Sequence, residues 1–404
     1  MDKCRCCNAP SPYVFLPMGA HPPANMFVPP ADAAKPQPAF SLDMAACLEC
    51  GLIQIEDQIP ADFFRHYLYV PSGAQTMHGH FEQTAQVLTT LADGGLIVDI
   101  GCNDGLLLGA CIRLGAKTLG VDPAANLVPL AKERGVEVHV AYFNPETAHE
   151  LLAARGPAKV IVTTNTFNHI GDLDSFMQGV AILLAADGSF VIEVPQALEL
   201  LKRNRFDNIY QEHVSEFSLL SLKRLGERFG FRLVHVDPIA VHGGSMRVRL
   251  QPETLGTPPS DAVRELLDAE EAYGIHDRAT YDAFAARIEA VRRKLIDKID
   301  ALRSQGKKIA GYGAPAKGNT LLNYFGIGPD RIDFLVDKNP LKHGLLSPGM
   351  KIPIRGVEAI EAEKPDVLLV LAWNFFDEIR SQQAGFERGG GKFLMPLPEP
   401  ALLP

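Results

Sequence analysis

Residues 97–105 read Ile-Val-Asp-Ile-Gly-Cys-Asn-Asp-Gly. The apolar run that ends at Ile100 is typical of a buried parallel strand, and three leucines at 106–108 begin a helical pattern. Gly101 stands in the turn between them, where glycine permits positive φ angles and lets a ligand approach the main chain closely. The stretch therefore predicts a strand, a glycine turn and a helix, with a ligand site at the end of the strand.

The carboxylates beside this turn indicate the ligand. Asp99 ends the first strand, and a second strand is expected over 118–121, followed by Asp122, whose carboxylate is placed to bind both hydroxyls of a ribose. The turn lacks the G-x-G-x-x-G of dinucleotide-binding proteins and resembles the D-x-G-x-x-x-G motif I of S-adenosylmethionine (SAM) methyltransferases. We expect a SAM site built from Asp99, Gly101, Asn103, Gly105 and Asp122. The alternative is an ordinary strand–turn–helix unit of another α/β protein.

The composition is that of a globular protein. The 404 residues are 47% hydrophobic and 22% charged, which suits two or three domains of roughly 100–200 residues each. The net charge of −9 argues against binding to nucleic acid, and no stretch reaches the roughly 18 apolar residues of a transmembrane helix. The N-terminus also lacks the apolar core of a signal peptide. We expect a cytoplasmic protein, monomeric or homodimeric, that binds neither nucleic acid nor membranes.

Two C-x-x-C pairs predict a metal site in the first 60 residues. In the cytoplasm, cysteines are more often thiols or metal ligands than disulfides, and four thiolates in two such pairs suit a tetrahedral zinc ion. The proline-rich segment between the pairs builds little core, which a structural metal would offset. The expected ligands are Cys4, Cys7, Cys47 and Cys50, although Cys6 is surplus and could replace one of them. The alternatives are free thiols or a nucleic-acid-binding zinc ribbon.

Strands and helices alternate over 83–200, which predicts a doubly wound parallel sheet. Strands are expected near 96–100, 118–122, 136–140, 159–163 and 189–194, and helices near 106–114, 124–134, 146–155 and 174–186. Ligands of such sheets bind past the carboxyl ends of the strands. Polar or aromatic residues that follow the third, fourth and fifth strands are therefore expected in the pocket: Tyr142, Phe143, Asn165, Asn168, His169 and Glu193. Of these, Tyr142 and Phe143 are expected beside the adenine.

Residues 210–213, Tyr-Gln-Glu-His, form a polar cluster that is costly to bury unless its members bond each other or a ligand. A histidine beside a carboxylate is suited to general-base catalysis near neutral pH. A solvated polar turn is the alternative. A second group, of tyrosine, serine and histidine, lies within residues 61–82 just before the first strand of the SAM site and is expected to form a lid or pocket wall, or simply to pack.

Two glycine turns extend the expected substrate site. Residues 242–247 read His-Gly-Gly-Ser-Met-Arg, in which the glycines can present N–H groups to an anion and Arg247 can bind a phosphate. Two or three helices are expected over 259–305. Beyond them, residues 311–318 read Gly-Tyr-Gly-Ala-Pro-Ala-Lys-Gly at a strand–helix junction of a small Rossmann-like lobe, where Lys317 marks a diphosphate site. A hairpin turn and a packing turn are the respective alternatives.

In this order, the motifs resemble the nucleotide-sugar 3-C-methyltransferases of branched deoxysugar biosynthesis. The resemblance covers nearly the whole chain, and the motifs at 210–218, 242–247 and 311–319 are together more specific than the SAM motif. It implies an α/β protein with an N-terminal zinc-binding module, a central class I SAM-methyltransferase sheet and a C-terminal Rossmann-like lobe that binds the nucleotide sugar. The implied domains are 1–65, 66–250 and 251–404.

The resemblance also implies a reaction, in which SAM methylates C3 of a nucleoside-diphosphate-linked 4-keto-deoxyhexose through an enolate. His213 would remove the C3 proton, while Tyr210 and Glu212 would hold the sugar. His169 would approach the sugar, Tyr67 or Tyr69 would close the pocket, and zinc would be structural. The remaining substrate-binding residues would be Asn168, Glu193, His242, Ser245, Arg247, Tyr312 and Lys317.

Other targets stay open at this point. The enzyme could be a SAM-dependent O- or N-methyltransferase or could methylate another ketone, and a non-catalytic SAM- or nucleotide-sugar-binding protein is a weaker alternative. The sequence also leaves open the nucleotide, the stereochemistry at C3 and whether C3 carries a hydroxyl or an amino group.

Overall fold

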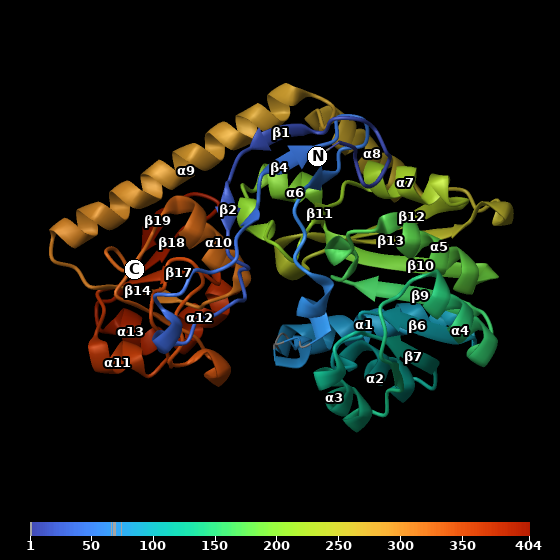
Figure 1. Ribbon diagram of the computed structural model, residues 1–404, viewed down its shortest axis with the longest axis horizontal. Helices are drawn as coiled ribbons and strands as arrows, with labels where there is room; N and C mark the ends of the chain where they lie inside the picture. Colours follow the sequence, from blue (N-terminus) through green and yellow to red (C-terminus); the bar gives the residue numbers. More distant parts are fainter. Residues whose placement is uncertain (1, 66, 68–69, 74) are drawn as a thin grey trace.

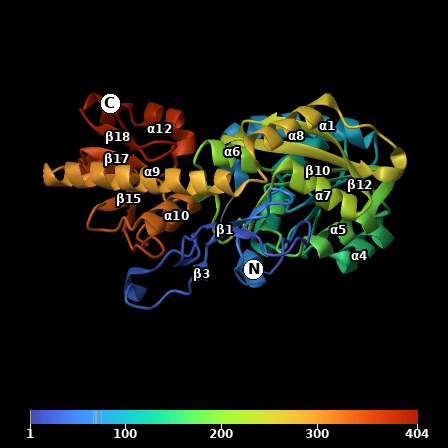
Figure 2. The same ribbon diagram turned by 90° about the horizontal axis from the view of Figure 1, so that it is seen from above.

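The computed structural model describes residues 2–65, 67, 70–73 and 75–404, without the side chains of 61, 62 and 242. Two α/β bodies lie at opposite ends of the molecule, with the N-terminal segment between them (Figure 1). The long helix α9 (Arg278–Ser304) runs from the region of the N-terminal strands along the C-terminal lobe, as Figure 2 shows from above. In the described ranges, no helix has both the length and the apolar character needed to cross a bilayer.

The central body is built on a seven-stranded sheet with the order β12-β13-β10-β9-β6-β7-β8. Five strands are parallel, and β13 runs antiparallel between β10 and β12. The predicted doubly wound methyltransferase sheet is confirmed. Its strands are β6 (Leu96–Ile100), β7 (Lys117–Val121), β8 (Val138–His139), β9 (Ala158–Thr164), β10 (Leu184–Pro195), β12 (Phe231–Ile239) and β13 (Ser245–Pro252).

Helices cover both faces of this sheet because the side chains of each strand alternate between the faces. Along β9, Val160 and Val162 pack with α1 (Gln75–Ala92) and α2 (Leu106–Arg113), whereas Ile161 packs with the helices of the other face. These are α4 (Pro145–Arg155), α5 (Leu173–Leu183) and α7 (Leu219–Arg228), and the short α3 (Val128–Glu133) follows β7. The helix expected over 174–186 ends earlier, at Leu183, because β10 begins within the same apolar run.

A four-stranded antiparallel sheet joins the N-terminal module to the central body. Its order is β1-β4-β5-β11, where β1 (Tyr13–Leu16), β4 (Met44–Ala46) and β5 (Ile53–Gln54) come from the N-terminus. The fourth strand, β11 (Ser215–Glu216), follows the expected catalytic cluster and pairs with β5. The small pair β2 (Ala20–His21) and β3 (Phe40–Ser41) extends the module towards the C-terminal lobe, where Val28 bridges to Leu346.

The C-terminal lobe has a six-stranded sheet with the order β16-β15-β14-β17-β18-β19, parallel except at β19. The predicted Rossmann-like lobe is therefore confirmed, and the exact division of the chain into domains stays a prediction. The strands are β14 (Ile309–Tyr312), β15 (Phe334–Val336), β16 (Ile354–Arg355), β17 (Val367–Val370), β18 (Lys392–Met395) and β19 (Ala401–Leu403). The helices are α10 (Ala316–Phe325), α11 (Ala359–Glu363), α12 (Phe376–Gln382) and α13 (Ala384–Arg388), while α6 (Ala197–Lys202), α8 (Asp261–Tyr273) and α9 connect the lobes.

Candidate active site

The expected donor site lies at the carboxyl ends of β6 and β7. Gly101 has φ +81°, and a Cβ at this position would lie 2.2 Å from the Thr166 hydroxyl, so only glycine lets the turn pass this close to the loop after β9. The Asp122 carboxylate accepts hydrogen bonds from the backbone N–H groups of Asn103 and Ala124, both at 2.8 Å. Gly105, with φ +73°, starts α2. The predicted donor-binding residues therefore meet at one sheet edge.

Polar atoms at this edge lack partners in the described part of the chain. Asp99 is fully buried with an unpaired Oδ1, and burial together with the charges of Asp122 and Glu193 raises its pKa to about 8. Asn165 adopts a positive φ of 52°, and its buried Oδ1 is also unpaired. Because buried polar groups are nearly always hydrogen-bonded, these atoms fit a polar ligand such as SAM. The SAM amino group and sulfonium would favour the ionised form of Asp99.

His213 occupies the centre of the expected catalytic cluster. Its Nδ1 lies 2.8 Å from the Asn208 carbonyl, which can only accept, so this nitrogen carries the proton. The lone pair of Nε2 is then free to accept from the Tyr210 hydroxyl at 2.7 Å. Burial and the charges of Lys317 and Arg205 lower the pKa of His213 to about 3, which keeps the imidazole neutral near pH 7. The ring is thus oriented as a proton acceptor.

Glu212, the residue before this histidine, contacts two other segments of the chain. Glu212 is buried and accepts hydrogen bonds from the Tyr67 hydroxyl at 2.7 Å and from the Asn25 amide at 2.5 Å. Desolvation raises the pKa of Glu212, because these two bonds offset only part of the cost of burying its charge. The predicted Tyr67 thus reaches the cluster, whereas Asn25 lies in the proline-rich segment and had no sequence signal. Tyr69 lies outside the described residues.

The loop after β9 connects the donor site to this cluster. The rings of His169 and His213 lie 4.9 Å apart, and burial lowers the pKa of His169 well below its usual value. Asn168 is fully buried, and neither its amide oxygen nor its nitrogen has a partner among the described residues. The structure therefore brings together His169, Asn168 and the 210–213 motif beside the donor-binding edge.

A second polar cluster, which we call the lobe-interface cluster, consists of Arg205, Asp207, Glu216, Lys317 and Trp373. The Trp373 indole donates to Asp207 at 2.7 Å, and Asn208 donates to Glu216. Burial raises the pKa of both carboxyls, to about 7 for Glu216. Sequence reasoning selected only Lys317 from this group, because the other four show no spacing that links them.

Some residues predicted to bind substrate have protein partners instead. Arg247 pairs with Glu193 at 2.6 Å and donates to Thr84 at 2.6 Å, while His80 lies 2.8 Å from the same carboxylate. Glu193 and Arg247 stand opposite each other in the β10–β13 register, which accounts for the ion pair. Ser245 donates to the Val241 carbonyl at 3.1 Å.

The structure also places the glycine turn at 243–244 and the aromatic residues that were expected beside the ligands. The Gly243–Gly244 pair presents its carbonyl oxygens to Arg205, at 2.9 and 3.3 Å, so the expected nest of N–H groups for an anion is wrong. Phe143 packs against Phe176 with ring centroids 5.2 Å apart, and Tyr142 is half-buried in the same loop after β8. Tyr312 packs in the core of the C-terminal lobe, and the His242 side chain lies outside the described residues.

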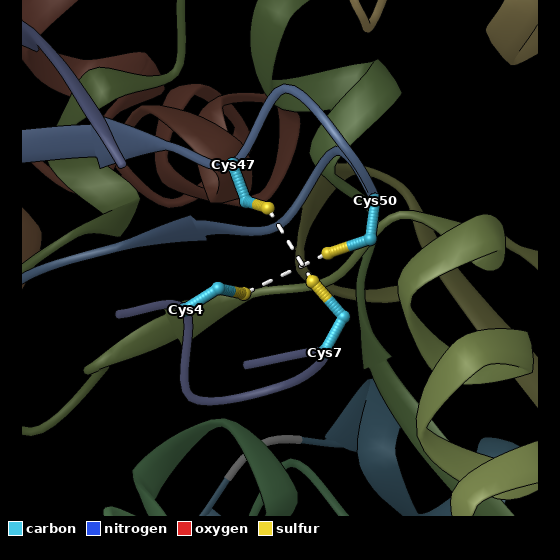
Figure 3. Close-up of side chains that lie close together, drawn as sticks. All are labelled: Cys4, Cys7, Cys47 and Cys50. Atoms are coloured by element: carbon cyan, nitrogen blue, oxygen red, sulfur yellow. Dashed lines mark hydrogen bonds between the residues drawn. The ribbon is translucent and has the colours of Figure 1, made fainter. Parts of the chain in front are cut away.

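The four predicted zinc ligands converge, as Figure 3 shows. All four Sγ atoms lie within 4.8 Å of one another, with 3.7 Å between Cys4 and Cys50 and 3.5 Å between Cys7 and Cys47. A tetrahedral zinc with bonds of about 2.3 Å places its sulfurs about 3.8 Å apart, so the quartet fits zinc and leaves no open coordination position. Cys6 is excluded from this set because its thiol donates to the Ser221 carbonyl at 2.9 Å.

The zinc module binds directly to the strand that follows His213. Arg5 lies between two of the ligands and donates to the Val214 carbonyl at 2.6 Å, the Ser215 hydroxyl at 3.2 Å and the Ile55 carbonyl at 2.9 Å. Ser218 donates to the Cys50 carbonyl at 2.7 Å. The metal site therefore supports the backbone of the catalytic cluster.

Comparisons with known proteins agree with this geometry. Three family models match: "Putative zinc binding domain" at 4–64, "Methyltransferase domain" at 76–236 and "C-methyltransferase C-terminal domain" at 240–398. The C-methyltransferase NovU of Streptomyces niveus is 38% identical over 407 aligned residues, which cover 100% of this chain and 97% of NovU.

More distant relatives match less than half of the chain. The ubiquinone biosynthesis O-methyltransferase of Rhodopseudomonas palustris strain TIE-1 is 30% identical over 112 residues, 28% of this chain and 44% of that protein. The structure of magnesium protoporphyrin IX methyltransferase (ChlM) from Synechocystis PCC 6803 with bound SAM matches 46% of this chain and 84% of that chain, with 13% identity and a TM-score of 0.32. The full-length match to NovU and the three consecutive domain matches show that this chain belongs to the SAM-dependent C-methyltransferases that carry an N-terminal zinc-binding domain.

Proposed function

We propose that this C-methyltransferase transfers the SAM methyl group to C3 of a nucleoside-diphosphate-linked 4-keto-deoxyhexose, with His213 as the base. The observation that carries the proposal is the orientation of the buried His213, whose Nε2 lone pair faces Tyr210 and whose ring lies 4.9 Å from that of His169. The match to NovU supports a carbon acceptor, and the motif at 210–218 supports a sugar. SAM binds at Asp99 and Asp122, and zinc stays structural.

A keto group beside the reacting carbon explains how a weak base suffices. The C4 carbonyl takes up the electron pair of the broken C3–H bond, so a neutral imidazole can act if the enolate oxygen is stabilised. Tyr210 and Glu212 hold the sugar hydroxyl groups or ring substituents, and Tyr67 closes the pocket over Glu212. Asn168 supplies two unpaired amide atoms to the same substrate. The protein otherwise orients both ligands and excludes water.

The test is replacement of His213 by asparagine, which keeps a polar side chain but no proton acceptor of comparable basicity. We expect methyl transfer, and exchange of the C3 hydrogen with D2O without SAM, to fall by a factor of about 10²–10⁴. Binding of S-adenosylhomocysteine should stay within twofold of wild type. The matched control is His235→Asn on β12, because His235 is partly exposed and its ring bonds Ser260 and Asp237, outside the 210–213 cluster.

The assay supplies a panel of 4-keto sugars linked to TDP, GDP or CDP and locates the new methyl group by NMR. Normal turnover of His213→Asn would remove the imidazole from the mechanism. A methyl group on oxygen or nitrogen would replace the proposal with the alternative methyltransferase class. Release of no S-adenosylhomocysteine with any acceptor of the panel would reject the sugar substrate.

A further inference from the structure

The ammonium of Lys317 is the most unusual charge in the lobe-interface cluster. Its Nζ is buried and has no hydrogen-bond partner among the described residues. Burial and the nearby Arg205 charge lower the pKa of Lys317 to about 8, although Asp207 and Glu216 act in the opposite direction. An unpaired buried ammonium is strongly disfavoured unless a ligand completes it. The Lys317 ammonium therefore needs a hydrogen-bond acceptor, which a bound substrate would supply.

Packing between the lobes fixes the position of the helix that carries Lys317. Lys317 stands in the first turn of α10, and Phe325 at the other end of this helix stacks on Phe206 with ring centroids 5.1 Å apart. Asn319 donates to the Ala24 carbonyl at 2.8 Å, which ties the same helix to the N-terminal segment. These contacts hold α10 against η6 (Phe206–Asn208), which precedes the 210–213 motif in the chain.

The charges around Lys317 indicate which anionic oxygen it binds. Two fully buried carboxylates, Asp207 and Glu216, lie in the same cluster, and each keeps one oxygen without a partner in the part of the chain that the structure describes. The cluster holds two cations, Arg205 and Lys317, beside these two carboxylates, so a diphosphate with two or more negative charges would be repelled more strongly than one developing negative charge. The Lys317 charge also helps to lower the pKa of His213, so the ammonium lies within electrostatic reach of the imidazole.

We propose that Lys317 is a catalytic residue that binds the C4 oxygen of the keto sugar and stabilises the enolate. The inference rests on the proposed function and assigns the lysine to the reacting end of the substrate instead of the diphosphate. As the C3–H bond breaks, the proton passes to Nε2 of His213 and the electron pair moves onto the C4 oxygen beside Lys317. The pair then returns to form the C3–CH3 bond, the C–S bond of SAM breaks, and S-adenosylhomocysteine leaves as a neutral thioether.

The same lysine couples the two charges that arise in this step. In the free enzyme its positive charge helps to keep the pKa of His213 low. When the C4 oxygen becomes negative, its charge offsets the positive charge of Lys317. The imidazole then becomes a stronger base while it receives the proton. One buried ammonium therefore favours proton transfer only when the substrate carbonyl is in place.

The experiment compares Lys317→Met, Lys317→Arg and the exposed control Lys338→Met of the same lobe, whose partner is Glu378. We expect Lys317→Met to lose C3 hydrogen exchange and methyl transfer by a factor of about 10²–10³, as expected for removal of an oxyanion-binding group. Binding of free TDP, GDP or CDP, measured by calorimetry, should stay within twofold. Lys317→Arg should keep part of the exchange activity, and Lys338→Met should keep all of it.

The pH profile of C3 hydrogen exchange is measured on the wild type and on Lys317→Arg, so it does not depend on whether Lys317→Met folds. Exchange by the wild type should fall above about pH 8 as Lys317 loses its proton, and Lys317→Arg should shift that fall to higher pH. A loss of nucleotide affinity of tenfold or more in Lys317→Met, with exchange unchanged at saturating substrate, would assign the lysine to the diphosphate and overturn the inference. A wild type that exchanges no 4-keto sugar would instead refute the proposed function, and the enolate role with it.

Discussion

Replacement of Arg5 by methionine tests whether the zinc module positions the catalytic strand. The guanidinium makes two short hydrogen bonds to carbonyl oxygens, 2.6 Å to Val214 and 2.9 Å to Ile55. Charge-assisted bonds of this kind contribute about 1.5–3 kcal/mol each, and the desolvation that lowers the pKa of Arg5 to about 10 offsets part of this gain. We therefore expect Arg5→Met to reduce the free energy of unfolding by about 2–4 kcal/mol.

The catalytic effect should exceed what lost stability explains. Val214 follows His213 directly, and its carbonyl keeps only a longer bond of 3.2 Å from the Ile55 N–H in the variant. A displacement of the imidazole by about 1 Å lowers rates by up to about 10², so we expect kcat to fall about tenfold to a hundredfold with little change in SAM affinity. Arg5→Lys should recover part of kcat because it restores one charged donor.

Arg228→Met is the matched control, because Arg228 binds the same module from its other side. It donates to the Cys6 carbonyl at 2.5 Å and to both Asp174 oxygens at 2.8 Å, and none of these contacts reaches the 213–215 backbone. Urea unfolding, bound zinc and kcat would be measured for all variants. The reasoning fails if Arg228→Met lowers kcat as much as Arg5→Met, or if Arg5→Met loses stability while kcat stays at the wild-type value.

Two other perturbations have defined outcomes. Cys47→Ser should abolish stoichiometric zinc in elemental analysis and reduce methyl transfer, while S-adenosylhomocysteine still binds, because the Asp122 carboxylate is held by N–H groups of the central body; retained zinc would contradict the four-thiolate site. Glu270 caps α7 through the Leu219 and Leu220 N–H groups, and burial raises its pKa from 4.5 to about 7. Between these two pH values the folded state then binds more protons than the unfolded state. The contribution of this group to the free energy of unfolding should therefore fall by roughly 3 kcal/mol as the pH rises from 4.5 to 7. Glu270→Gln should remove that part of the pH dependence of stability in urea titrations.

Local sequence pattern predicted the central sheet well because its strands are short apolar runs that end in turns with polar residues. The same pattern gave no information on strand pairing between distant segments. β11 has two residues and pairs with β5 of the N-terminal module, which no periodicity over 210–218 can indicate. The ion pair of Glu193 and Arg247 has the same origin, since the two residues meet only through the antiparallel register of β10 and β13.

The residues of the candidate site also fall into those that the local sequence predicts and those that only the fold reveals. The cluster at 210–213 was predictable because several polar groups stand close together in an otherwise apolar chain. Asn25 contacts Glu212 of this cluster, and Trp373 contacts Asp207 of the lobe-interface cluster. Both come from segments that carry no polar pattern of their own, so only the fold reveals them. Lys317 was noticed as a charge at a helix N-terminus, but its environment depends on Asp207 and Glu216, which the sequence places more than 100 residues earlier.

The three parts of the chain contribute unequally to the two ligand sites, and this has a consequence for how the enzyme works. Every described contact that orients Asp99, Asn103 and Asp122 lies within the central body. The catalytic cluster instead needs Tyr67 and Arg5 from the N-terminal side and Lys317 from the C-terminal lobe. A perturbation of either outer part should therefore reduce methyl transfer far more than donor binding. Such a separation would let the enzyme hold SAM before the acceptor arrives, with the acceptor site completed only where all three parts meet.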